Sequence, residues 1–265
     1  MAAGLNFDVV GEGRPDFAFL HGLFGRGRNW TQVAKGLAAL GWTSVLFDLP
    51  NHGASPWTEH FSYPETAALV AAEIQERLGP DAALTLAGHS MGGKVAMLLA
   101  LAHPGLVSSL AVIDIAPTRS AQVSGFSTYF EAMDALDLTT LANRAQADQS
   151  LAARIPDRAV RGFLLTNLRP DGGWHWQPNL RLLEDELDVI SEWPDPGGVS
   201  YPGPTSWIVG ANSPYYREED LAGMQRLFPQ VRTVVVPDAA HWVHADNPSA
   251  VVAALDELRS SVTRR

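Results

Sequence analysis

The 265-residue sequence contains no cysteine. This absence excludes disulfide bonds, a thiol nucleophile and thiolate-held metal sites, and it is compatible with a reducing compartment. Basic residues are also few: 19 Lys and Arg stand against 29 Asp and Glu, which leaves a net charge of −10. Because nucleic acids and anionic membrane surfaces attract proteins through basic patches, we expect neither as a partner.

Long hydrophobic runs and a leader segment are missing as well. The opening residues, MAAGLNFDVV, lack both the basic segment and the apolar stretch of a secretory signal. The longest apolar run, VAMLLALA at 95–102, is far shorter than the ~20 residues that a membrane-spanning helix needs. We therefore expect a cytoplasmic protein that binds no membrane.

What the sequence does contain is an alternation of short apolar runs with helical stretches. Runs typical of buried strands lie at 17–20, 44–47, 83–88, 110–115, 205–210 and 231–236. Helices are expected in NWTQVAKGLAAL, in SYPETAALVAAEIQERLG, where Ser62 and Glu65 have the spacing of a capping box, and from near Asn247, with Pro248 at N1. The alternation predicts an α/β fold, with a mostly parallel twisted sheet and helices on both faces.

The alternation is interrupted in the middle of the chain. Residues 117–202, called the insert below, read as helices broken by turns and end in a connector rich in Pro and Gly. We therefore expect a core domain made of residues 1–116 and 203–265, and a helical cap domain made of residues 117–202.

The candidate nucleophile is Ser90, in the segment GHSMG that follows an apolar run and opens a helical pattern. A serine on a sharp strand-to-helix turn exposes its hydroxyl, and the crowded backbone there requires Gly88 and Gly92. A glycine-flanked structural turn is the alternative. Lys94, further along this helix, is expected at the helix surface.

The other parts of an acyl-transfer site follow from this serine. His241, in the loop after the last strand, is the candidate base, with His244 as its rival. The backbone N–H groups of Met91 and Leu23 are the candidate oxyanion hole, with Leu23 preferred to Phe24.

The acid is harder to place, because Asn212 and Ser213 follow the strand at 205–210 and neither can be anionic. The preceding strand is expected to end near Asp114, and neighbouring parallel strands point their C-terminal ends to one edge. Asp114 is therefore the preferred acid; the rivals are Asp48, Asp238 and Glu218.

The motifs LHGLFG, DLPNHGAS, GHSMGG, IDIAP, GANSPY and AHWVHADNP occur in an order that resembles the α/β-hydrolase superfamily, and more narrowly its YbfF-type esterase branch. The resemblance implies the α/β-hydrolase fold, an acid relocated to Asp114, and action on short- to medium-chain esters or thioesters, with acyl-CoA among the candidates. The chain departs from the pattern at Pro50, where such proteins often have Arg.

The predicted function is therefore a carboxylic ester hydrolase that works through an acyl-enzyme on Ser90, with a small-molecule substrate and no metal or organic cofactor. Carbon–carbon bond hydrolysis, elimination or perhydrolysis by the same triad are alternatives, and a non-catalytic binding module is a further one. The sequence leaves monomer or dimer open. Aromatic side chains that could line the substrate site are Phe24, Phe126, Phe130 and Trp174.

Overall fold

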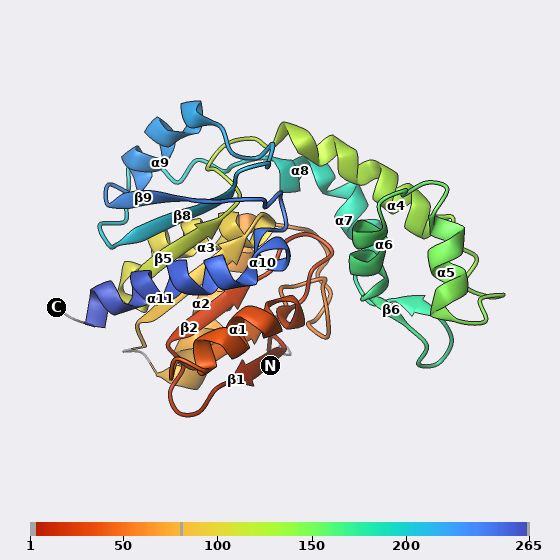
Figure 1. The fold of residues 1–265 in the computed structure, drawn as a ribbon, viewed down its shortest axis with the longest axis horizontal. Coiled ribbons are helices and arrows are strands. Elements are labelled where there is room, and N and C mark those ends of the chain that lie inside the picture. The colour runs from red at the N-terminus through yellow and green to blue at the C-terminus, as the bar shows by residue number, and fades with distance from the viewer. Residues whose placement is uncertain (1–3, 80–81, 264–265) are drawn as a thin grey trace.

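A computed structural model describes residues 4–79 and 82–263 of the chain. Seven strands form one twisted sheet in the order β1-β3-β2-β4-β5-β8-β9 (Figure 1). Neighbouring strands run parallel, except that β1 pairs antiparallel with β3. The strands are β1 (Phe7–Val10), β2 (Phe17–Leu20), β3 (Ser44–Phe47), β4 (Leu84–His89), β5 (Val107–Ile113), β8 (Thr205–Gly210) and β9 (Val231–Val236).

The six predicted strands are all present, and two details differ from the expectation. The predicted strand at 110–115 begins earlier and ends at Ile113, so Asp114 lies just beyond β5. The edge strand β1 was not predicted, because its side chains are only half-buried and its sequence has no continuous apolar run.

Helices cover both faces of the sheet, as predicted. One face carries α1 (Thr31–Ala38) and α11 (Pro248–Thr263), with the short α10 (Val243–Asp246) beside them, and the other face carries α2 (Tyr63–Leu78), α3 (Met91–Ala102) and α9 (Leu221–Leu227) (Figure 1). Short 3₁₀ turns occur at η1 (Gly27–Trp30), η2 (Pro104–Leu106) and η4 (Glu218–Asp220).

The start of α2 is only half of the predicted capping box. The Ser62 hydroxyl accepts a hydrogen bond from the backbone N–H of Glu65 at 3.3 Å, as expected for an N-cap residue. The Glu65 carboxylate, however, does not return to Ser62, because it pairs with His60 Nε2 at 2.9 Å.

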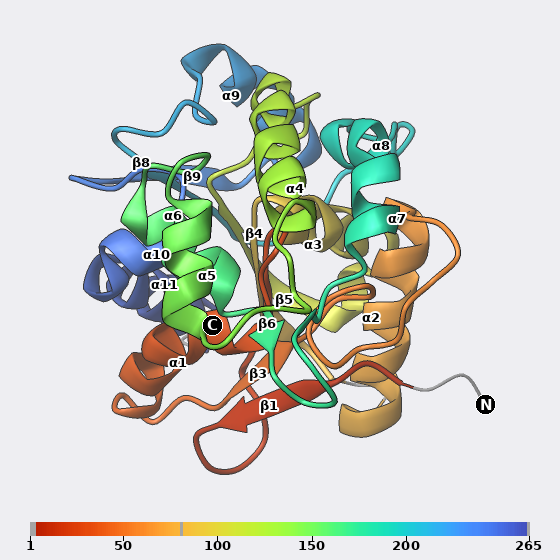
Figure 2. The same ribbon diagram turned by 90° about the vertical axis from the view of Figure 1, so that its right-hand side faces the viewer.

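The insert leaves the sheet after β5 and returns at β8. It holds η3 (Ala121–Phe126), α4 (Ser127–Asp134), α5 (Arg144–Leu151), α6 (Arg158–Leu165), the two-stranded hairpin β6 (Leu168–Arg169) and β7 (His175–Trp176), α7 (Leu180–Asp185) and α8 (Leu187–Ser191). Its helices gather on one side of the molecule, beyond one end of the sheet (Figures 1 and 2). Within the described ranges, no helix combines the length and the apolar character needed to cross a membrane.

The strand register sets the place of the candidate site. Leu20 pairs with Gly88, His89 with Ile113, and Ile113 with Ile208, so that β2, β4, β5 and β8 end at nearly the same level. The loops that follow these strands therefore meet at one edge of the sheet, which is where α/β proteins place their ligands.

Candidate active site

Ser90 sits on a strained turn between β4 and α3. Its φ of 52° lies in the left-handed region, which residues other than glycine seldom adopt. A Cβ on Gly88 would lie 2.2 Å from the carbonyl oxygen of Gly92, and a Cβ on Gly92 would lie 2.4 Å from that of His21. The glycines on either side of the serine are therefore needed because backbone passes too close for any side chain, as the sequence spacing predicted.

His241 lies in the loop after β9 and reaches the serine. Its Nε2 is 3.1 Å from Ser90 Oγ, and its Nδ1 is 2.7 Å from Asp114 Oδ2. Because a carboxylate only accepts hydrogen bonds, Nδ1 carries the proton and Nε2 is free to accept one from the serine hydroxyl. The ring of Tyr215 stacks on the imidazole at 3.8 Å between centroids and holds its plane.

Asp114 is fully buried, and both of its carboxylate oxygens accept hydrogen bonds. Its Oδ1 accepts the backbone N–H of Gly210 at 2.9 Å, and its Oδ2 accepts the hydroxyl of Ser213 as well as His241 Nδ1. A buried charge is tolerated only when such partners replace water. The residue also has a φ of 53°, a left-handed turn that bends the chain out of β5 at this point.

The rival acids lie elsewhere or are otherwise occupied. Asp48 accepts the backbone N–H groups of Gly27 and Ala54 and so braces two core loops. Asp238 and Glu218 are exposed. The structure therefore brings only Asp114, of the four candidates, within hydrogen-bond distance of His241 among the described residues.

The other histidines near the site stay neutral. His244 stacks on Trp30 at 4.3 Å, and burial lowers its pKa to about 3. His21 accepts the backbone N–H of Leu49 through Nε2, and burial lowers its pKa to about 4. His89 lies 2.7 Å from the backbone carbonyl of His241 through Nε2, with its pKa pushed well below the usual range by burial.

His89 and Tyr215 are contacts of His241 that the sequence did not single out. His89 lies directly before Ser90, and Tyr215 lies in the loop after β8. Their places in the GHSMG and GANSPY segments were the available signals, but nothing in either segment says that the side chain meets His241.

The two candidate oxyanion donors border the same space as the serine. A cavity of about 20 Å³ is lined by Ser90 together with Leu23 and Met91, and by Tyr63, Lys94, Ile115, Ser120, Phe126, Ile190 and Tyr215. The loop that carries Leu23 approaches the serine closely: a Cβ on Gly22 would lie 3.2 Å from Ser90 Cβ. The assignment of the Leu23 and Met91 backbone N–H groups as oxyanion donors stays a prediction.

The aromatic residues predicted for the substrate site lie in three different places. Phe126 lines the cavity. Phe24 and Phe130 are buried behind it, with ring centroids 4.6 Å apart. Trp174 is half-buried at the β6–β7 hairpin and packs against the apolar core, not among the side chains that line this cavity in the described part of the chain.

The position of Lys94 differs from the prediction. It was predicted at the helix surface, but only 1% of its surface is exposed, and it lines the cavity beside Ser90. The prediction failed because the insert covers this face of α3, and nothing in the sequence of the helix reports that cover. Among the residues that the structure describes, no cluster of three or more His, Cys, Asp or Glu is arranged to hold a metal ion.

Comparisons with known proteins add relatives to this geometry. A sequence model of the α/β-hydrolase fold family matches residues 17–248. The chain is 38% identical over 264 residues to the sn-1-specific diacylglycerol lipase ABHD11 of Danio rerio, covering 97% of this chain and 80% of the relative. It is 32% identical to esterase YbfF of Escherichia coli, covering 89% of both. A solved marine microorganism esterase is 30% identical, with a TM-score of 0.89 over 96% of this chain and 99% of that one.

Proposed function

The chain belongs to the α/β-hydrolase fold family and is a carboxylic ester hydrolase, and from that premise we propose that Ser90, His241 and Asp114 are its catalytic triad. The resemblance to α/β hydrolases and YbfF-type esterases, drawn from the motifs, is confirmed by these relatives. One observation carries the proposal: an unbroken line of hydrogen bonds runs from Ser90 Oγ through His241 to Asp114 at the sheet edge.

The proposed reaction is acyl transfer in two halves. His241 Nε2 takes the proton of Ser90 Oγ while that oxygen attacks the carbonyl carbon of the ester. Asp114 keeps the imidazole in the correct tautomer and stabilises the imidazolium that forms. His241 then gives the proton to the leaving alcohol or thiol, and a water molecule, activated in the same way, releases the acid and restores Ser90.

The negative charge that develops on the carbonyl oxygen needs donors that are already in place. We assign this role to the backbone N–H groups of Met91, at the N-terminal end of α3, and of Leu23, on the loop after β2. The helix dipole of α3 adds to the stabilisation, because the positive end of the helix faces the site.

For the substrate, we propose a small-molecule ester or thioester with a short- to medium-chain acyl group. The small cavity beside Ser90 supports the shorter acyl groups, and the named activities of the relatives, esterase and diacylglycerol lipase, support an ester bond. We also propose that residues 117–202 act as a cap domain over the site, because Phe126 and Ile190 of the insert border the cavity that Ser90 opens into.

A fluorophosphonate probe and a series of nitrophenyl esters test the triad. We expect the probe to label Ser90, and the Ser90→Ala variant to lose about 10⁶-fold in kcat, the scale of removing a triad serine. Ser249→Ala, at an exposed serine near the start of α11, is the matched control and should keep full activity. Labelling at a different serine, or a Ser90→Ala variant as active as the wild type, would overturn the proposal.

A dienone substrate belongs in the same assay. Turnover of the dienone with slow ester hydrolysis would assign the triad to carbon–carbon bond cleavage, whereas fast ester turnover without action on the dienone supports the proposed function.

A further inference from the structure

Lys94 is a buried cation one helical turn from Ser90, and the proposed mechanism does not use it. Its amino group lies among backbone carbonyl oxygens near the end of the insert. Nζ donates hydrogen bonds to the carbonyl oxygens of Ser191 and Glu192 at 2.7 Å each, and it lies 3.5 Å from the carbonyl oxygen of Ile190. The insert is therefore joined to α3 through the side chain of a core residue.

Tyr63 reinforces the same attachment from a second core helix. Its hydroxyl donates to the carbonyl oxygen of Ile190 at 2.7 Å. The backbone N–H of Ser120, where the insert begins, donates to the carbonyl of Ser191 at 2.8 Å. Thus the end of α8 is held by a lysine on α3, a tyrosine on α2 and the first residues of the insert.

The chemistry of a helix end explains why a lysine is placed there. The last carbonyl groups of a helix have no partner within the helix, and the negative end of its dipole favours a cation. Burial lowers the pKa of Lys94 to about 7, while the nearby Glu192 carboxylate opposes that change. In the described structure the hydrogen bonds of the Lys94 side chain all go to backbone carbonyl oxygens at the end of α8, so its polar group is occupied in holding that segment.

The cavity beside Ser90 is bordered by Ile190 of the insert and by Lys94 and Tyr63 of the core. Among the described residues, Tyr215 also lines this cavity, and its ring stacks on His241. In the proposed acyl-enzyme the acyl group is bonded to Ser90 Oγ, so it lies next to these walls. At about 20 Å³ the cavity is small, so the position of its walls limits the length of the acyl chain that can enter.

We propose that Lys94, with Tyr63, is a positioning residue that determines acyl-chain specificity by holding Ile190 as the wall of the acyl cavity. The attachment keeps the cavity short and favours small acyl groups; loss of the attachment lets the end of α8 move away and admits longer chains. The inference rests on the proposed function, since it takes the cavity beside Ser90 as the acyl site.

The test compares kcat/KM for nitrophenyl octanoate and nitrophenyl acetate. Lys94→Met keeps an unbranched side chain that is one atom shorter and removes the hydrogen-bond donors. We expect the octanoate-to-acetate ratio of kcat/KM to rise by about tenfold or more, within the range that apolar pockets use to discriminate chain length. The rise should come mainly from a lower KM for octanoate, because the triad is untouched. Tyr63→Phe removes one of the hydrogen bonds and should raise the ratio less.

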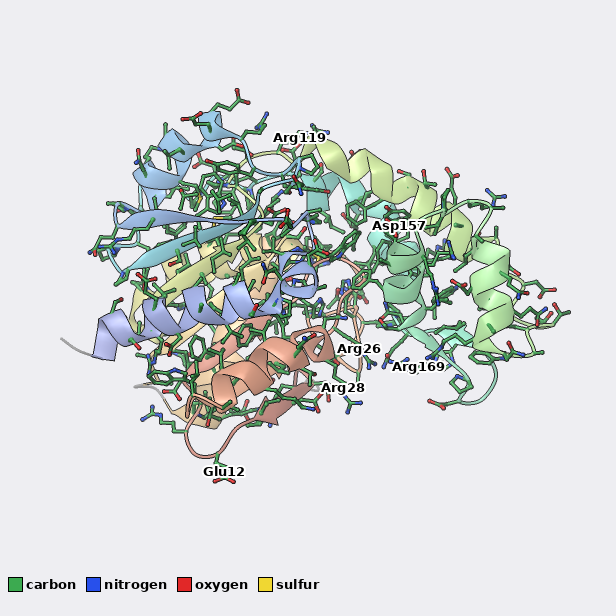
Figure 3. The ribbon with its side chains drawn as sticks, viewed as in Figure 1. Glu12, Arg26, Arg28, Arg119, Asp157 and Arg169 are labelled. Atoms are coloured by element: carbon green, nitrogen blue, oxygen red, sulfur yellow. The ribbon has the colours of Figure 1, made fainter. Side chains whose placement is uncertain are left out.

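Arg119→Met is the matched control. Arg119 is a cation that pairs with the same segment, through Glu192 at 2.7 Å and Asp188, but it lies exposed at the edge of the molecule beside α8 (Figure 3). Its loss removes a positive charge near the end of α8 without touching the buried carbonyls. The ratio should stay at the wild-type value.

The outcomes separate the two proposals. An unchanged ratio in a folded Lys94→Met variant that still hydrolyses acetate overturns the inference and leaves the triad standing, whereas a wild-type protein that hydrolyses no ester overturns the proposed function. If Lys94→Met does not fold, Tyr63→Phe and Ile190→Ala decide: both should raise the ratio, and no change in either refutes the inference. If Lys94→Met instead loses only its activity on a hemisuccinate ester, Lys94 binds anionic acyl groups directly. That result also refutes the inference.

Discussion

Asp114 and Ser213 are hydrogen-bonded to each other although they lie on the loops after two neighbouring strands, β5 and β8. The Ser213 hydroxyl donates to the same carboxylate oxygen that receives His241 Nδ1. In many α/β hydrolases a carboxylate follows the strand equivalent to β8. Here a serine stands in that loop and supports a carboxylate supplied by the strand beside it.

The acid assignment predicts a strong contrast between two aspartates. Asp114→Asn should lower kcat by about 10⁴-fold, because the amide can no longer hold the imidazole in the required tautomer or stabilise the imidazolium. Asp238→Asn, at an exposed turn three residues before His241, should have little effect. Steady-state kinetics on one nitrophenyl ester measures both, and the assignment is wrong if the two variants exchange behaviour.

The contact between Asp114 and Ser213 predicts that the acid can be moved. In the double variant Asp114→Ser, Ser213→Asp, the carboxylate would come from the loop after β8, and the new serine could donate to it. We expect kcat at least about tenfold above that of Asp114→Ser alone, since one regained hydrogen bond to a charged group is worth about 1.5–3 kcal/mol. The single variant Ser213→Asp is the control and should show no gain over wild type. Equal activity of the double variant and Asp114→Ser, with matched melting temperatures, would contradict the prediction.

The loop after β2 passes close to Ser90, and this predicts the effect of adding one methyl group at Gly22. A Cβ at position 22 would come within 2.9 Å of His89 Nδ1 and 3.2 Å of Ser90 Cβ, so Gly22→Ala must push the loop that carries Leu23 away from the serine. We expect kcat to fall by about 10²-fold with a smaller change in KM, the scale of losing one oxyanion donor. Gly125→Ala, where no atom lies within 4 Å of the added carbon, is the control. Similar kinetics for the two variants would argue against Leu23 as a donor.

The buried histidines predict a loss of stability in acid. Burial lowers the pKa of His21 to about 4 and that of His52 and His244 to about 3, whereas an unfolded histidine has a pKa of about 6.5. Between pH 6.5 and these lower values the unfolded chain binds protons that the folded chain does not, so the free energy of unfolding falls as the pH falls. The melting temperature should therefore drop steadily from pH 7 to pH 4.

One substitution measures how much a single histidine, His244, contributes to this loss of stability. His244→Phe keeps a ring to stack on Trp30 and removes a group whose Nδ1 is buried without a partner in the described structure. The drop in melting temperature between pH 7 and pH 4 should be smaller in this variant than in the wild type. Parallel curves for the two proteins would show that His244 does not contribute.

Local sequence patterns were sufficient to predict those features that depend on residues close together in the chain. The apolar runs predicted six strands of the sheet, because strands buried on both faces cannot carry polar side chains. The glycines around Ser90 predicted the sharp turn, because backbone crowding there acts within a few positions of the chain. The relatives confirm the family that these motifs indicated.

Contacts between distant segments were beyond such patterns. The position of Lys94 within its own helix predicts a surface residue, but the insert covers it, and its contact with Ser191 joins residues 97 positions apart in the chain. The meeting of Asp114 with His241 depends on the level at which parallel strands end, which the order of the residues suggests but does not specify. Side-chain type and spacing thus established the chemistry available to this chain, whereas strand register and the docking of the insert established which groups meet and how much space they enclose.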